Sequence, residues 1–181
     1  MRINSKELIV RGISYTIRSA EIQDARQLSE VRLQIDGETE NMDREKGEAY
    51  IDCTGFEKII EEDTQAPNHL FLVAEVDGAI VGFSRCEGNS LKRTAHKVEF
   101  GVCMLQAYWG YGIGGALLSE TLDWTDAAGI KKVVLTVLET NEKAIKLYEK
   151  HGFNVEGILR QDKLLSDGNY YNTVVMGRIS I

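Results

Sequence analysis

Short runs of alternating apolar and polar residues occur along most of the chain, and this period of two is typical of half-buried β-strands. In residues 95–104, Val98 and Phe100 share one face of the expected strand, whereas Glu99 lies on the opposite face. The same alternation, or a short apolar run, recurs in six further segments. The pattern predicts strands over residues 14–19, 70–75, 79–85, 95–104, 131–138, 153–165 and 170–179.

Three other segments place apolar residues three or four positions apart, which is the period of a helix. They predict helices over residues 20–35, 114–128 and 141–151, the last of them ended by Gly152. The resulting order of strands and helices predicts a mixed α/β (α+β) fold, with helices packed on one central sheet. No repeat or linker interrupts this order, so we expect a single domain over residues 1–181.

Charge is distributed unevenly along the chain. The sequence holds 21 basic and 28 acidic residues, a net charge of −7, which argues against a nucleic-acid partner because phosphate binding needs a basic surface. Residues 36–63 contain eleven acidic and three basic residues, a local net charge of −8, so the rest of the chain has a net charge of +1. This segment either concentrates cations near a binding site or is a solvated polar surface.

Several classes of protein are excluded by simple patterns. Three cysteines (Cys53, Cys86 and Cys103) form no disulfide framework, and no metal-ligand spacing is visible, so we expect no metal. The first twelve residues do not resemble a signal peptide. No segment approaches the roughly 18 apolar residues of a membrane span. We therefore expect a cytoplasmic protein with no membrane partner.

A glycine cluster marks the first candidate site. Residues 109–118 read Trp-Gly-Tyr-Gly-Ile-Gly-Gly-Ala-Leu-Leu and connect a predicted strand to a predicted helix. Glycines let a ligand approach backbone amides closely, and the start of a helix attracts anions. A phosphate or pyrophosphate site is the functional interpretation, and a tight turn without ligand is the alternative. The Gly-Lys-Ser/Thr of a P-loop is missing, and the spacing does not match a dinucleotide fingerprint.

The second candidate site is the predicted helix over residues 141–151. Asn141, Ala144, Ile145 and Tyr148 fall on one stripe of this helix. A polar asparagine and a tyrosine hydroxyl on an inward stripe need partners there. They either contact a ligand, or they are a helix cap and a core tyrosine.

Together, the two segments resemble the GNAT acyl-CoA-dependent N-acetyltransferases. That family carries a Gln/Arg-x-x-Gly-x-Gly/Ala loop, followed by a helix that reads like Asn-x-x-Ala-x-x-x-Tyr and ends at Gly-Phe. The resemblance extends over about residues 14–181 and is most specific in 98–153. Trp109 departs from it, since it replaces the Gln or Arg of the loop. The tail over residues 157–176 resembles the small-molecule and ribosomal-protein amine acetyltransferase branch.

The resemblance implies a mostly antiparallel sheet, splayed between residues 98–104 and 132–138, with acetyl-CoA as cosubstrate and its pantetheine arm lying along the first of these strands. An amide near Val102 or Cys103 would face the thioester carbonyl. The residues implied in cofactor binding are Met104, Leu105, Gly110, Gly112, Ile113, Gly114, Gly115 and Asn141.

The resemblance further implies direct attack by an amine in a ternary complex. Tyr148 is the expected acid for the departing thiolate, because a phenol is protonated at neutral pH. Glu99 is the expected base; a water chain, or a Glu99 that merely pairs with Lys97 or Arg93, is the alternative. Cys103 is expected to pack rather than to carry an acyl group.

The acceptor is expected to be a small cationic amine, an amino acid or a protein N-terminus. The acidic segment would border its site, which makes Glu38, Glu40 and Asp43 candidate acceptor-binding residues. A homodimer is left open, since dimers are common in the family. The competing hypothesis is a non-catalytic acyl-CoA-binding sensor or interaction module on the same fold, against which Tyr148 and Glu99 argue.

Overall fold

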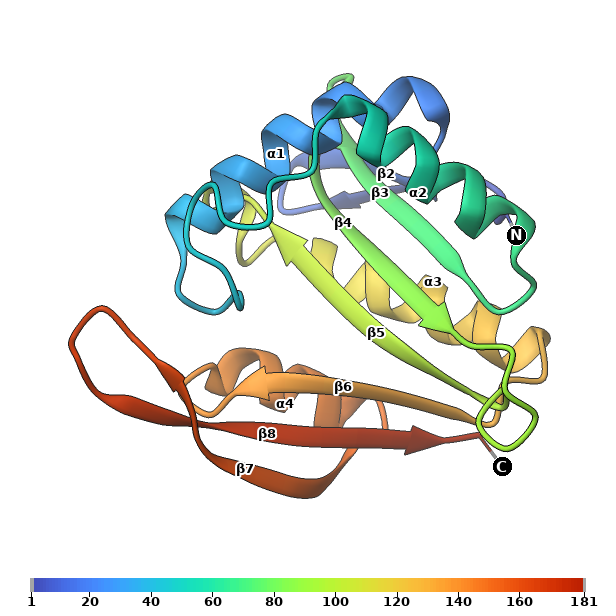
Figure 1. Ribbon diagram of the computed structural model, residues 1–181. Coiled ribbons are helices and arrows are strands. Elements are labelled where there is room, and N and C mark those ends of the chain that lie inside the picture. The colour runs from blue at the N-terminus through green and yellow to red at the C-terminus, as the bar shows by residue number, and fades with distance from the viewer. Residues whose placement is uncertain (1, 181) are drawn as a thin grey trace.

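The computed structural model describes residues 2–180, which form an eight-stranded sheet with helices on both faces (Figure 1). The strands are β1 (Lys6–Val10), β2 (Ile13–Ser19), β3 (Leu70–Val76), β4 (Ala79–Gly88), β5 (Lys97–Met104), β6 (Lys132–Leu138), β7 (Asn154–Leu164) and β8 (Tyr170–Ile179). The helices are α1 (Ala25–Glu38), α2 (Cys53–Gln65), α3 (Ile113–Ala127) and α4 (Glu142–Lys150), with short 3-10 turns η1 (Ile22–Asp24) and η2 (Gln106–Tyr108).

The sheet is mixed and mostly antiparallel, as predicted. Its strand order is β1-β2-β3-β4-β5-β6-β8-β7, and only β5 and β6 run parallel. These two strands pair only from Lys97 opposite Lys132 to Glu99 opposite Val134, and beyond that point they diverge (Figure 1). The predicted splay in the middle of the sheet is therefore confirmed.

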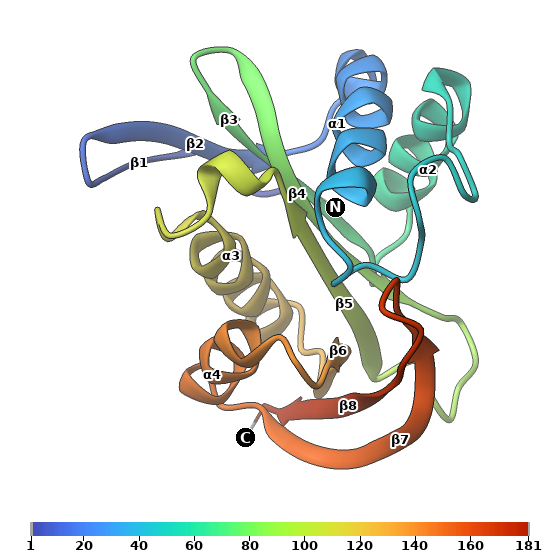
Figure 2. The same cartoon turned by 90° about the vertical axis from the view of Figure 1, so that its left-hand side faces the viewer.

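Each face of the sheet is covered by a pair of helices. Helices α1 and α2 lie on one face and α3 and α4 on the other (Figure 2). The first pair encloses a core around Leu28, Ile35 and Phe56, and the second covers a larger core that includes Leu117 and Tyr148. Each buried side chain of this kind contributes about 1.5–3 kcal/mol to folding, so both faces anchor the splayed sheet.

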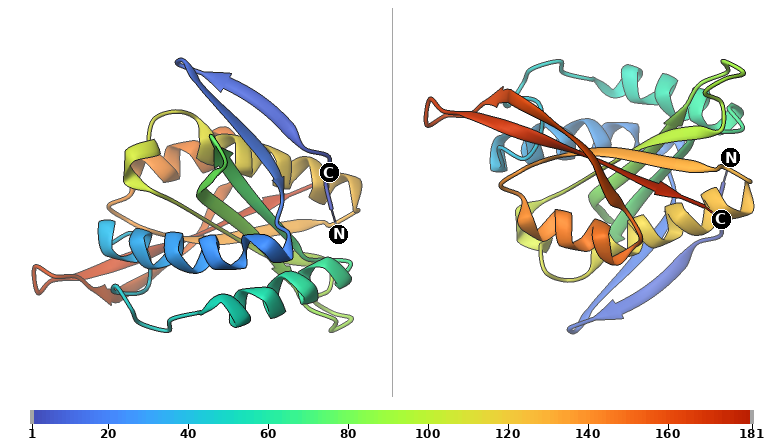
Figure 3. Two further views of the ribbon diagram at one scale, coloured as in Figure 1. Left: turned by 90° about the horizontal axis from the view of Figure 1, so that it is seen from above. Right: turned by 90° about the horizontal axis from the view of Figure 1, so that it is seen from below.

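The apolar pattern did not predict two of the observed elements, helix α2 and strand β1. Helix α2 lies at the end of the acidic segment, and its N-cap is Asp52, whose carboxylate accepts a hydrogen bond from the amide of Gly55. Strand β1 forms a hairpin with β2 that extends from the sheet edge (Figure 3). Its two turn residues, Arg11 and Gly12, both have positive φ, which matches the twist of a two-residue hairpin.

None of the helices in residues 2–180 combines the length and the apolar character needed to cross a membrane.

Candidate active site

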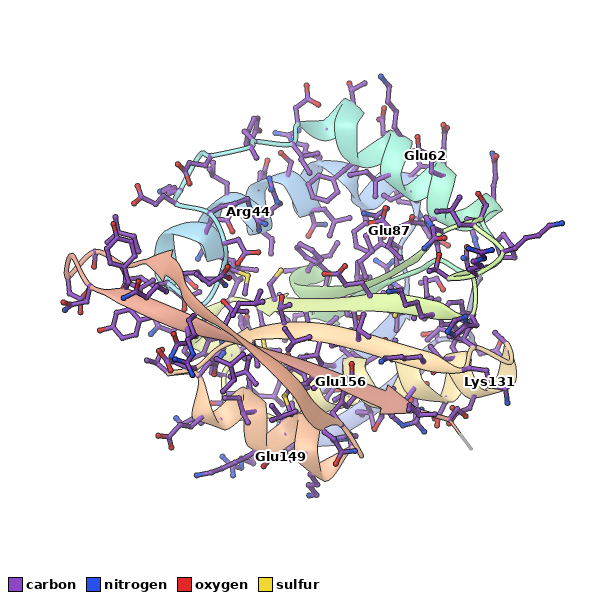
Figure 4. The ribbon with its side chains drawn as sticks, turned by 60° about the horizontal axis from the view of Figure 1, so that its bottom comes forward. Arg44, Glu62, Glu87, Lys131, Glu149 and Glu156 are labelled. Carbon is purple, nitrogen blue, oxygen red and sulfur yellow. The ribbon has the colours of Figure 1, made fainter. Side chains whose placement is uncertain are left out.

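A cavity of about 640 Å³ lies where β5 and β6 separate. Glu99 and Gly101 of β5 line one wall, and Tyr148 and Asn141 line another. Side chains from α1, α2, β4 and the loop after α1 complete it, among them Arg44 and Glu87, which are labelled in Figure 4. The cavity thus brings β5 and helix α4 together, whereas none of the described residues that line it belongs to the glycine loop.

One backbone edge of β5 faces this opening. The amide of Leu105 donates to the carbonyl of Val81 on β4, at 2.9 Å. Because consecutive residues of a strand point their amides to opposite sides, Val102 and Met104 direct theirs away from β4, into the gap. This corrects one expectation, since the Leu105 amide is already bonded. It also favours Val102 over Cys103 as the residue whose amide faces a ligand.

The glycine loop leads directly into α3. Gly112, with φ of +79°, occupies the N-cap of this helix, a left-handed conformation that favours glycine. The amides of Ile113, Gly114 and Gly115 have no backbone acceptor among the described residues, as expected for a first helical turn. This end of α3 therefore presents several free donors and a partial positive charge.

Tyr148 lies on α4 with its ring packed against Phe100 and Phe153, at centroid distances of 6.5 and 5.8 Å. The side chain is 7% exposed, and burial raises its pKa to about 12, so the phenol is protonated at neutral pH. No hydrogen bond joins its hydroxyl to another residue within 2–180. The hydroxyl is therefore available to a molecule in the cavity.

Asn141 combines both of the roles considered for it. Its side-chain oxygen caps α4 by accepting from the amide of Ala144 at 3.3 Å. Its side-chain nitrogen has no partner among the described residues, and Asn141 lines the cavity. The cap fixes the side chain and leaves a donor for a ligand.

Glu99 is an exposed residue on the cavity side of β5. Within the described chain it forms no ion pair with Lys97 or Arg93, so the pairing considered from the sequence is not observed. Two residues further along, a Cβ atom placed on Gly101 would meet nothing within 4 Å. A free carboxylate thus lies beside open space, as a proton acceptor for a bound molecule requires.

Comparison with known proteins decides the family. The sequence model of the Acetyltransferase (GNAT) family matches residues 35–153, well over half of the chain. The chain belongs to this family.

Relatives and solved structures of GNAT proteins agree. The L-amino acid N-acetyltransferase AaaT of Escherichia coli is 32% identical over 109 residues, 60% of this chain and 67% of that protein. A GNAT acetyltransferase from Streptococcus pneumoniae superposes with a TM-score of 0.88 at 28% identity, covering 92% of this chain and 99% of the other. The putative acetyltransferase yncA of Salmonella typhimurium, solved with acetyl-CoA, has a TM-score of 0.80 at 22% identity, covering 91% and 93%.

Trp109, the residue that departs from the GNAT loop pattern, has a defined place in this acetyltransferase. Its indole nitrogen donates to the carbonyl of Met104 at 3.1 Å, although the side chain is 42% exposed. The contact ties the end of β5 to the glycine loop. The sequence showed the substitution, but not this bond.

Arg11 lies beside the same loop and was not among the expected site residues of this GNAT chain. It comes from the β1–β2 turn, and a Cβ atom placed on Gly110 would lie 3.8 Å from its guanidinium. Val10 and Tyr15 approach Gly112 similarly, at 3.9 Å. The hairpin thus brings a cation to the loop whose own first position holds Trp109. The alternation around Arg11-Gly12 was the signal that could have revealed it.

The acidic residues expected to bind the acceptor have other partners. Glu38 accepts from the amide of Gln106 at 2.7 Å, and Glu40 accepts from the amide of Ser166 at 2.8 Å. Asp43 forms an ion pair with Lys163. Only Asp43 of the three lines the cavity. These carboxylates hold the loop after α1 against η2 and the β7–β8 hairpin, whose proximity Figure 2 shows.

Cys103 lies on the cavity side of β5, where burial raises the pKa of its thiol to about 12. A thiol in this state is protonated at neutral pH and is a poor nucleophile. This agrees with its interpretation as a packing residue.

Proposed function

We propose that this chain transfers the acetyl group of acetyl-CoA to a primary amine, by direct attack in a ternary complex. The observation that carries the proposal is the free backbone edge of β5 between Phe100 and Met104, which opens into the cavity shared by Glu99 and Tyr148. A strand edge of this kind binds an extended, amide-containing chain such as pantetheine.

The cofactor would follow this edge toward the glycine loop. The amide of Met104 would bond the pantetheine, and the side-chain nitrogen of Asn141 would donate to it from the opposite wall. The pyrophosphate would then lie at the start of α3, where anions are favoured. We assign that contact to Gly110, Gly112, Ile113, Gly114 and Gly115, and we add the guanidinium of Arg11.

The thioester carbonyl would lie beside Val102. The amide of Val102 faces the gap, so it can donate to the oxygen that becomes negative when the amine attacks. A donor held by a sheet needs little reorganisation at that step. The open space beside Gly101 leaves room for the amine.

Proton transfer completes the reaction. Glu99, directly or through a water, would accept the proton that the ammonium must lose before it attacks. The tetrahedral intermediate then collapses, the carbon–sulfur bond breaks, and the coenzyme A thiolate takes a proton from the hydroxyl of Tyr148. The nitrogen of the new amide loses its remaining extra proton, which restores the hydroxyl of Tyr148. The buried position of Tyr148 keeps this proton in place until the thiolate forms.

The name of the Escherichia coli relative, an L-amino acid N-acetyltransferase, supports an amino acid among the candidates.

Thiol release from acetyl-CoA, measured with separate panels of amino acids, polyamines and short peptides, tests the proposal. We expect release with at least one panel and micromolar to millimolar binding of acetyl-CoA by calorimetry. Binding without release on any panel would favour the non-catalytic sensor. Absence of binding would reject both functions.

A further inference from the structure

The side chains that line the cavity carry a net positive charge, whereas the segment over residues 36–63 is acidic. Three of the charged lining residues are acidic: Asp43, Glu87 and Glu99. Five are basic: Arg32, Arg44, Arg85, Lys97 and Lys163. The cavity wall is therefore net positive, although residues 36–63 are strongly negative.

Most of these cations have a carboxylate of their own. Arg85 binds Asp63 through two hydrogen bonds of 2.6 and 2.8 Å and also contacts Glu87. Lys163 pairs with Asp43. These pairs neutralise one another and leave no excess charge for a ligand.

Arg32 differs from them. It lies on α1, it is only 8% exposed, and within residues 2–180 it forms no ion pair. Its one hydrogen bond goes from Nη1 to the carbonyl of Ala49, at 2.8 Å. Burial lowers its pKa, and the nearby charge of Arg44 lowers it further. A buried charge without a counter-ion is costly.

The charge of Asp36 opposes this lowering of the pKa of Arg32, but Asp36 forms its ion pair with Arg44. Arg44 donates to both oxygens of Asp36, at 3.1 and 3.0 Å. Arg32 and Arg44 both line the cavity, but within residues 2–180 only Arg44 forms an ion pair with Asp36. The thiol of Cys103, which lines the same cavity, is neutral, since burial raises its pKa to about 12. Among the lining cations, Arg32 and the partly exposed Lys97 thus form no ion pair within residues 2–180, and Arg32 is the buried one of the two.

The position of this charge relates it to the reaction centre. Arg32 lines the same cavity as Gly101 and Cys103 of β5. Cys103 is two residues from Gly101, a separation of about 7 Å along a strand. An amine beside Gly101 and an anionic group beside Arg32 would thus belong to one small molecule.

We infer that the acceptor carries a carboxylate close to its reactive amine, as an amino acid does, and that Arg32 binds this carboxylate. The inference rests on the proposed function and adds the acceptor class to it. A guanidinium suits the task because its planar donors match the two oxygens of a carboxylate. A polyamine would instead bring a second cation toward Arg32 and Arg44, which is unfavourable.

The structural alternative is that Arg32 only holds the loop after α1, through Ala49. An experiment must therefore measure something that a loosened loop does not change. The preference for a carboxylate over a neutral carboxamide is such a quantity, because both ligands have the same shape and enter through the same loop.

The first measurement compares kcat/KM of the wild-type protein for L-amino acids and for their carboxamides, at equal concentrations of free amine. We expect the acid to be preferred by roughly 10- to 100-fold, which is the usual contribution of a charged hydrogen bond. Spermidine serves as a further probe, because it has no carboxylate and brings additional positive charge toward Arg32. We expect it to be the poorest acceptor.

The second measurement repeats the comparison with Arg32→Met. We expect kcat/KM for the acid to fall to the level of the carboxamide, while the KM of acetyl-CoA stays unchanged. Arg26→Met is the matched control, since Arg26 lies on the same helix but is exposed and pairs with Glu30. Arg32→Lys should restore part of the preference.

The outcomes separate the two proposals. If carboxamides or spermidine are acetylated as well as amino acids, the inference is overturned and the acetyltransferase stands. A preference that survives in Arg32→Met overturns it as well, because the carboxylate is then bound elsewhere. Acetyl-CoA binding without acetylation of any amino acid also overturns it. Failure to bind acetyl-CoA overturns the proposed function itself.

Discussion

The cofactor side and the acceptor side of the cavity are built in different ways. The cofactor side consists of β5, the glycine loop and the start of α3, which are continuous in the sequence and offer mainly backbone amides. The acceptor side consists of side chains from α1, the loop after it, β4 and the β7–β8 hairpin. Its loops are held by distant contacts, such as Glu40 with Ser166. A local backbone site tolerates side-chain changes such as Trp109, whereas an assembled side-chain site depends on each of its members.

The largest expected effect is that of Tyr148→Phe, which removes the acid shared by both sides. We expect kcat to fall by about 10²- to 10⁴-fold, while the KM of acetyl-CoA changes little. In the wild type, kcat should show no loss from tyrosine ionisation below about pH 10, because its pKa of about 12 keeps the phenol protonated until higher pH. Steady-state kinetics from pH 6 to 10 check both statements. An unchanged kcat in the variant would remove Tyr148 from the mechanism.

Glu99→Gln tests the acceptor side alone. We expect kcat/KM for the amine to fall by about 10²-fold at neutral pH, and the defect to shrink as pH rises, because solution base then deprotonates the amine. Measurement of kcat/KM for the amine from neutral to alkaline pH, at saturating acetyl-CoA, tests this expectation. A defect below about threefold at neutral pH would point to a water chain that does not need Glu99.

Gly112→Ala tests the cofactor side. Alanine at φ of +79° is strained by about 1–2 kcal/mol, so the start of α3 should shift and the KM of acetyl-CoA should rise about tenfold. Gly129→Ala is the control, because Gly129 follows the other end of α3 with φ of +70° and open space around it. It should lower thermal stability similarly but leave the KM unchanged. Equal KM effects in both variants would contradict the assignment.

The smallest expected effect is that of Arg11→Met. Because Arg11 is exposed, its contact with a phosphate is screened, and we expect the KM of acetyl-CoA to rise only about three- to fivefold. The rise should be larger at low salt and should vanish near 1 M salt. Titrations at several salt concentrations measure this, with Arg26→Met as the control. A rise that does not depend on salt would show that Arg11 supports the hairpin instead.

Local pattern determined most of the fold and the cofactor side. The alternation of Val98, Phe100 and Glu99 and the glycines of residues 109–118 encode a strand, a turn and a helix start within one stretch, so period and spacing were sufficient to predict them. Family membership is confirmed through those same residues. The single domain, the cytoplasmic location and the homodimer stay predictions.

Only the tertiary structure decided the acceptor side. Sequence charge suggested a site for cations, but Glu38 and Glu40 turned out to bond backbone amides, and Arg32 turned out to be buried with no ion pair among residues 2–180. The reason is physical: a charge acts according to its partners and its burial, and both depend on segments far apart in the chain. A backbone amide at a helix start, in contrast, acquires its direction from the residues beside it.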